Sequence, residues 1–156
     1  MCKVVSWVFP CAASSVPQAR RHVRSALAAW DVPDGDPAGD VWEDLELVVG
    51  ELAGNATKFC RGRIRMTVEV HHNHARVEVL DDGDGRESLH LTEPKAPSPD
   101  AESGRGLVIV SALSSSWGAE RTSTSVAGRS GTKVWAELAF PSVSPYFTLA
   151  CELAAV

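Results

Sequence analysis

The stretch DLELVVGELAGNATKFC, residues 44–60, has the spacing of a helix that packs against a sheet. Beside its apolar stripe lie Glu51, Asn55 and Lys58, which fall within about 60° of one another at roughly 100° per residue. We therefore expect these three polar side chains at the edge of the core. The apolar residues recur at steps of three and four, which keeps them on one side of a helix: Trp42, Leu45, Val49, Leu52, Ala56 and Phe59.

A polar row at the edge of a core can form a half-desolvated site. A carboxylate and an amide one turn apart, such as Glu51 and Asn55, can hold a hydrated Mg²⁺ or orient a water. A lysine one turn further on, Lys58, can meet a phosphate. An isolated Glu-x-x-x-Asn is more often an ordinary solvated helix edge, so the site hypothesis needs matching features elsewhere in the chain.

Length and composition are those of one soluble globular domain. The chain has 156 residues, 44% of them hydrophobic, and a net charge of -5. We assign residues 1–140 to a single domain and leave the C-terminal tail, 141–156, unassigned. There is no basic excess to drive counterion release, which argues against direct nucleic-acid binding. No apolar run approaches the length of a membrane span, which argues against a membrane role.

The four cysteines, at positions 2, 11, 60 and 151, form no C-x-x-C pair and no dense framework. This pattern favours a reducing, cytoplasmic location, and reactive roles for the cysteines are not expected. The start, MCKVVSWVFPCAA, faintly imitates a signal peptide. Its six apolar residues, broken by Pro10, are too few for the apolar core of one. We interpret residues 3–9 as a first strand.

The rest of the chain alternates between helical and extended patterns. Three arginines, at positions 20, 21 and 24, are expected on a solvated face of the first helix, with a partner surface as the alternative. Ser14 and Ser15 offer helix-cap chemistry, and Asp40 offers a cap for the helix at 44–60. The predicted elements are a helix over 14–30, a hairpin over 64–70 and 75–81, a long loop over 86–103, a helix over 107–113, and a hairpin over 117–126 and 132–140.

Two glycine-containing motifs could each contribute to a ligand site. Asp81-x-Gly83-x-Gly85 follows a predicted strand and permits a tight turn that leaves one carboxylate at the mouth of a pocket. Such a carboxylate can accept a hydrogen bond from an exocyclic amine, although a plain acidic turn has the same sequence. The stretch 103–107, SGRGL, opens a helix, and its free N–H groups suit phosphate oxygens. It is neither a Walker loop nor a Rossmann fingerprint.

Other chemistries fit the sequence poorly. A calcium loop that begins at Asp82 would need glycine at its sixth position, where Glu87 stands. His71, His72 and His74 could trap a metal, but three histidines in a hairpin turn without a second ligand cluster are more often solvent-exposed. No motif for a catalytic serine or cysteine nucleophile is found.

The order of these motifs resembles that of the Bergerat-fold ATPases, the superfamily of gyrase and the histidine kinases, from about residue 41 to 138. Within that superfamily, the stretches WVFP, SVPQARRHVRSAL and ESGRGLVIVSAL, followed by WG, look like the bacterial anti-sigma-factor serine kinases. The resemblance implies an α/β two-layer sandwich in which a mixed, largely antiparallel sheet carries three helices on one face. It also implies ATP and Mg²⁺ as ligands and phosphoryl transfer as the reaction.

The resemblance also implies roles for single residues. Asn55 would hold the Mg²⁺, and Glu51 would be the general base or would orient the attacking hydroxyl. Asp81 would accept from the adenine amino group. The loop 86–103 would be a lid over the nucleotide. The adenine pocket would be shaped by Gly83, Gly85 and Thr132. The residues that would approach the phosphates are Lys58, Gly104, Arg105, Gly106 and Leu107.

Three positions depart from the anti-sigma pattern or bear on it. Many anti-sigma kinases carry an arginine where this chain has Glu102, and Arg105 is near but not equivalent. Phe59 stands where that subfamily commonly has histidine. Glu51 favours the anti-sigma interpretation, because histidine kinases usually have asparagine there.

The function expected from the resemblance is that of an anti-sigma factor with serine kinase activity. Its partners would be a sigma factor and an anti-anti-sigma protein, and relatives often form homodimers. One alternative is a nucleotide-gated sigma-binding protein that has lost phosphoryl transfer, which Glu102 makes credible. The other is a detached histidine-kinase catalytic domain. This alternative would require a phosphoacceptor histidine, and His22 lacks the expected acidic neighbour.

Overall fold

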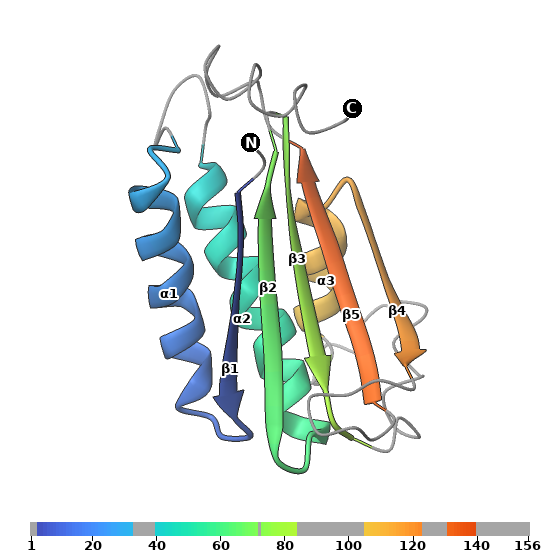
Figure 1. The fold of residues 1–156 in the computed structure, drawn as a ribbon. Coiled ribbons are helices and arrows are strands. Elements are labelled where there is room, and N and C mark those ends of the chain that lie inside the picture. Colours follow the sequence, from blue (N-terminus) through green and yellow to red (C-terminus); the bar gives the residue numbers. More distant parts are fainter. Residues whose placement is uncertain (1–2, 33–39, 72, 84–104, 123–130, 140–156) are drawn as a thin grey trace, which may run out of the picture.

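The computed structural model describes residues 3–32, 40–71, 73–83, 105–122 and 131–139. Three helices lie on one face of a five-stranded sheet (Figure 1). This arrangement confirms the predicted two-layer α/β sandwich. The elements are β1 (Lys3–Pro10), α1 (Ser15–Ala29), α2 (Val41–Phe59), β2 (Arg63–Val70), β3 (His74–Asp81), α3 (Arg105–Leu113), β4 (Ser116–Thr122) and β5 (Gly131–Ala139).

The sheet has the strand order β1-β2-β3-β5-β4. Each pair of neighbouring strands in the described ranges is antiparallel, so the predicted mixed character of the sheet is wrong. β3 and β4 run in the same direction, since each is antiparallel to β5. β5 lies between them, and the parallel pair expected of a mixed sheet is therefore not formed.

The core lies between the helices and the inner face of the sheet. Strands β2, β3 and β5 alternate buried and more exposed residues, as half-buried strands do. Helix α2 begins three residues earlier than the predicted start at Asp44 and ends at Phe59. Its predicted apolar stripe is buried except for Phe59, which is only partly covered.

The N-terminal ends of α1 and α2 are not capped by the side chains that the sequence predicted. Ser14 and Asp40 occupy the N-cap positions of α1 and α2, but neither side chain makes a capping hydrogen bond. The Ser15 hydroxyl instead donates to the Pro10 carbonyl at 2.7 Å, which joins α1 to the end of β1. At its other end α1 closes with Asp31 at φ 53 and a hydrogen bond from Val32 N to Leu27 O at 3.1 Å. That bond is typical of a Schellman cap.

Helices α1 and α2 pack closely at Gly50. A Cβ atom on Gly50 would lie 2.5 Å from Arg20 Cζ, closer than side chains approach one another. The Arg20 Nε is buried and has no hydrogen-bond partner within the described ranges. The prediction that Arg20 lies on a solvated face of α1 is therefore wrong for its Nε, which is buried. A side chain at position 50 would therefore require the Arg20 guanidinium, which crosses α2 there, to move.

None of the described helices is both long enough and apolar enough to cross a membrane.

Candidate functional site

The predicted site residues on α2 lie at the edge of the core, as their spacing predicted. Glu51 and Asn55 are half-buried, and Lys58 in the last turn is exposed. The helix is held by its buried stripe against β2, β3 and β5, which leaves this polar row at one side. Three other element ends carry predicted site residues: the end of β3, the start of β5 and the start of α3.

Asp81 is the last residue of β3, and its side chain is almost fully buried, with 3% exposed. Its Oδ1 accepts hydrogen bonds from Gly83 N at 2.8 Å and from Thr132 N at 3.3 Å. Burial raises the pKa of the Asp81 carboxyl, and these two N–H groups offset part of that increase. Both bonds reach the same oxygen, so Oδ2 is the atom that can accept from a ligand.

Two glycines allow the backbone around Asp81 to pack closely. A Cβ on Gly83 would lie 2.6 Å from Phe59 O, at the end of α2. A Cβ on Gly131 would overlap the Asp81 carbonyl oxygen. Any side chain at these positions would push β5 or the end of α2 away from the end of β3. The glycines thus bring α2, β3 and β5 together at one end of the sheet.

Thr132 supplies a buried hydroxyl beside Asp81. Its side chain is fully buried, and Oγ1 has no hydrogen-bond partner among the residues that the structure describes. Buried hydroxyls in folded proteins are almost always paired with protein, water or ligand. The Thr132 hydroxyl, unpartnered within the described ranges, and the Asp81 carboxylate adjoin across the contact between β3 and β5, and together they fit the polar edge of a heterocycle such as adenine.

Glu51 reaches from α2 to the start of α3. A Cβ on Gly106 would lie 2.5 Å from Glu51 Oε2, so the carboxylate occupies the space that a side chain at Gly106 would need. Arg105 is exposed, and Leu107 is buried. Gly85, Gly104, Glu102 and the predicted lid over 86–103 lie outside the described residues, as does the tail over 141–156.

Asp82 contributes a connection that the sequence did not predict. Its carboxylate accepts backbone N–H groups from Arg61 at 2.9 Å, Gly62 at 3.0 Å and Arg63 at 3.2 Å. Burial alone would raise the pKa of Asp82, but these hydrogen bonds outweigh it and the pKa is lowered. Asp82 therefore fastens the segment between α2 and β2 to the turn that carries Asp81.

A disulfide joins Cys11 to Cys60, with the two Cα atoms 5.9 Å apart. The sequence pattern favoured a reducing environment and did not predict this pair, because the two cysteines are 49 residues apart. Cys60 is the residue that caps α2, and Cys11 follows β1.

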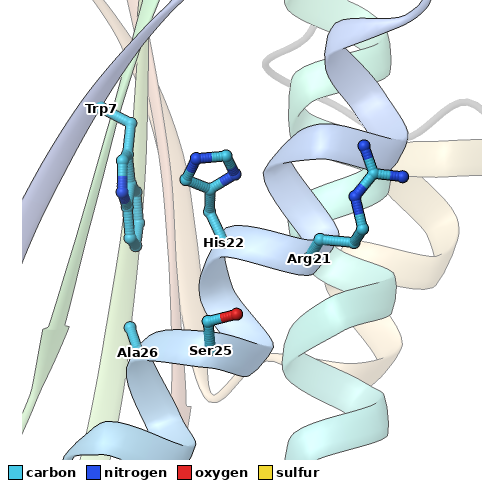
Figure 2. Close-up of a pocket in the computed structure, with 5 residues that line it drawn as sticks. All are labelled: Trp7, Arg21, His22, Ser25 and Ala26. Atoms are coloured by element: carbon cyan, nitrogen blue, oxygen red, sulfur yellow. The ribbon is translucent and has the colours of Figure 1, made fainter.

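The hollow shown in Figure 2 lies between β1 and α1 and has a volume of about 570 Å³. The His22 ring stands edge-on to Trp7 and Phe9, and His22 Nδ1 lies 2.8 Å from Gln18 O. β1 is the edge strand opposite β4, and the hollow contains none of the predicted site residues. Its lining is Trp7, Arg21, His22, Ser25 and Ala26.

No cluster of three or more potential metal ligands of the His, Cys, Asp or Glu types occurs within the described ranges. The His71 and His74 rings stack at 4.3 Å, and His74 Nδ1 contacts Asn73 Oδ1 at 2.9 Å. The predicted magnesium ligand, Asn55, is an amide and would act with phosphate oxygens and water rather than with a protein cage.

A family model described as the histidine kinase-like ATPase domain matches residues 9–137. Among solved structures, the chain is similar to the mycobacterial sensor histidine kinase MprB, with 19% sequence identity and a TM-score of 0.47. That match covers 87% of this chain and 99% of the MprB chain. No curated protein matches the chain.

Proposed function

The chain belongs to the histidine kinase-like ATPase domain family, and from this we propose that it binds ATP with Mg²⁺ and phosphorylates a serine or threonine of a partner protein. The partner would be an anti-anti-sigma protein, and the chain would act as an anti-sigma factor that exchanges this partner for a sigma factor. The observation that carries the proposal is the position of Glu51. It lies one helical turn before Asn55, and its carboxylate is held against the start of α3.

The adenine end of the nucleotide would bind at Asp81. The free oxygen of this carboxylate would accept the adenine amino group, and the Thr132 hydroxyl would complete the polar edge of the pocket. Gly83 and Gly85 would let the backbone approach the base. This part of the proposal is supported by the buried Thr132 hydroxyl, which has no described partner, and by the adjoining Asp81 carboxylate, whose Oδ1 alone accepts the two backbone N–H groups.

The phosphates would lie between α2 and α3. The Asn55 amide oxygen would hold Mg²⁺, which when bound neutralises charge on the phosphates. Lys58 and Arg105 would add positive charge. The backbone N–H groups of Gly106 and Leu107, at the positive end of α3, suit phosphate oxygens, and Gly104 is expected to join them.

Glu51 would take the proton from the hydroxyl of the partner protein. A positioned base of this kind contributes about 10²- to 10⁴-fold to rate and adds little to ground-state affinity. Glu51 is half-buried at the edge of the core, beside the start of α3. Because Gly106 has no side chain, the Glu51 carboxylate can occupy the space beside it.

A second function is favoured by Glu102. It stands where many anti-sigma kinases have arginine, and a carboxylate there would repel a phosphate. In this alternative the chain binds ATP and a sigma factor but transfers no phosphate. The partners, a cytoplasmic location and a homodimer all remain predictions in both versions.

Transfer of labelled γ-phosphate to a co-purified partner, identified by mass spectrometry, tests the proposal. Glu51→Gln should bind ATP like the wild type and lose transfer, and Asn55→Ala should weaken both. Glu43→Gln is the matched control, because Glu43 is an exposed carboxylate in the first turn of the same helix. Binding without any labelling by the wild type would favour the second function. Undiminished transfer by Glu51→Gln would remove this residue from the mechanism.

A further inference from the structure

The segment 59–63 lies between the two halves of the proposed nucleotide site. On one side it continues α2, which carries Asn55 and Lys58. On the other side it touches the turn after β3, where Phe59 O packs against Gly83 and the Asp82 carboxylate accepts three backbone N–H groups from the segment. Movement of this segment would therefore move both halves.

Cys11 anchors the same segment from the other side. Its N–H donates to Gly62 O at 2.9 Å, and its sulfur is bonded to Cys60. The separation of the two Cα atoms, 5.9 Å, is within the usual range for disulfides, so the pair can bond without a change in the backbone. Both cysteines are partly exposed residues, and exchange with a small thiol or disulfide requires access to them.

We propose that Cys11 and Cys60 form a reversible oxidation site that controls the affinity of the neighbouring nucleotide site. This inference rests on the proposed binding of ATP. The oxidant is a low-molecular-weight disulfide. One cysteine thiolate attacks it and releases one thiol, and the second cysteine then attacks the mixed disulfide and releases another. The pair loses two electrons and two protons, and the small disulfide is reduced to two thiols.

The effect on affinity follows from order at the end of α2. In the oxidised protein a covalent bond joins Cys60 to the end of β1. In the reduced protein this covalent bond is lost, while the hydrogen bond from Cys11 N to Gly62 O and the hydrogen bonds to Asp82 remain. The last turn of α2 and Gly83 then have more freedom, which nucleotide binding must remove. The reduced form therefore binds ATP more weakly.

Linkage gives a second, independent measurement. If oxidation strengthens ATP binding by some factor, ATP must shift the thiol–disulfide equilibrium toward the disulfide by the same factor. Couplings between sites in proteins are typically about fivefold or larger, and we expect a factor in this range.

The experiment uses the full chain with Cys2→Ser and Cys151→Ser, which leaves only the pair. Calorimetry with ATP and Mg²⁺ is done after oxidation with glutathione disulfide and after reduction with dithiothreitol. The equilibrium with glutathione is measured with and without ATP, and peptide mapping identifies the bonded cysteines. Adding Cys11→Ser gives a variant that cannot form the bond, and it should bind ATP like the reduced protein under both conditions.

The expected result is ATP binding that is at least about fivefold tighter in the oxidised protein, with an equal shift of the glutathione equilibrium by ATP. Equal ATP affinity in both states would overturn the redox proposal and leave ATP binding intact. Unfolding of the reduced protein, seen by circular dichroism, would also overturn it, since the bond would then be a structural staple. If neither form binds ATP, the proposed function is refuted. The redox proposal is then refuted too, because there is no nucleotide site to control.

Discussion

Replacing Gly50 by alanine tests how α1 and α2 pack, and Gly54 provides a matched control in the same helix. In a helix interior, alanine is more favourable than glycine by about 0.8 to 1.0 kcal/mol. Among the described residues, a Cβ on Gly54 would have no heavy atom within 4 Å apart from its chain neighbours and the nearby backbone of its own helix. Gly54→Ala should therefore stabilise the protein by about 1 kcal/mol, which raises Tm by about 2 to 4 °C for a chain of this size.

Gly50→Ala has the same helix preference but meets the Arg20 guanidinium, whose Cζ lies 2.5 Å from the position of the new Cβ. The Arg20 side chain must move, and overpacking of this kind typically costs about 1 to 3 kcal/mol. The preference is common to both sites, so the two variants should differ in free energy of unfolding by about 1 to 3 kcal/mol. Gly50→Ala should be neutral or destabilised.

Denaturant unfolding of the two single variants is compared with the same substitutions in an Arg20→Ala background. Without the guanidinium, Gly50→Ala should stabilise as much as Gly54→Ala does, because the three atoms nearest to the new methyl group all belong to the Arg20 guanidinium. Equal stabilisation by both substitutions in the wild-type background would show that Arg20 does not lie against Gly50, and would refute this packing of α1 on α2.

Three further predictions follow from named contacts. Asp82→Asn should lower the free energy of unfolding by about 1 to 3 kcal/mol at pH 7, since three backbone N–H groups lose a charged acceptor. The pKa of Asp82 is lowered in the folded state, so this contribution is complete above the unfolded value of about 3.9 and is lost as pH falls through the folded pKa. Denaturant titrations across pH should therefore show the difference in free energy of unfolding between wild type and variant closing at low pH. A difference that stays constant with pH would contradict the charge argument. Gly106→Ala should displace the Glu51 carboxylate and reduce phosphoryl transfer by about 10²-fold, with a smaller loss of ATP affinity, measured with the labelled transfer assay and calorimetry; equal losses would mean that Gly106 serves binding alone. Cys11→Ser should lower the free energy of unfolding by about 2 to 4 kcal/mol, because the disulfide closes a loop across a separation of 49 residues; an unchanged denaturant midpoint would count against the bond.

The elements could be predicted because their signals are local. Periods of three to four residues marked the helices, and alternation marked the strands of the 63–81 hairpin. The two hairpin pairings, of β2 with β3 and of β4 with β5, were predicted because their strands are consecutive in the chain. The pairings of β1 with β2 and of β3 with β5 were not, because other elements separate these strands in the sequence. The predicted helix caps were wrong for a related reason. The Ser15 hydroxyl found a tertiary partner, Pro10 O, instead of the first turn of its own helix.

The candidate site was predictable where a motif and its residue types were enough. Asp81 and the Glu51–Asn55 pair were found from spacing and from the order of motifs, and the structure buries Asp81 beside Thr132. The supports of the site were not predictable, because they join residues far apart in sequence. Asp82 binds the N–H groups of a segment about twenty residues earlier, and Cys60 bonds to a cysteine 49 residues away.

Calorimetry of ATP·Mg²⁺ binding to the wild type and to Asp81→Asn tests the central claim, that this end of the sheet is a nucleotide site. Asparagine can keep an oxygen for Gly83 N and Thr132 N, but its NH₂ group then replaces Oδ2 and faces the adenine amino group, donor to donor. Such a mismatch costs about 1 to 3 kcal/mol, so affinity should fall by about 5- to 150-fold while the variant stays folded. No binding by the wild type, or equal binding by the folded variant, would contradict the assignment of Asp81 to adenine.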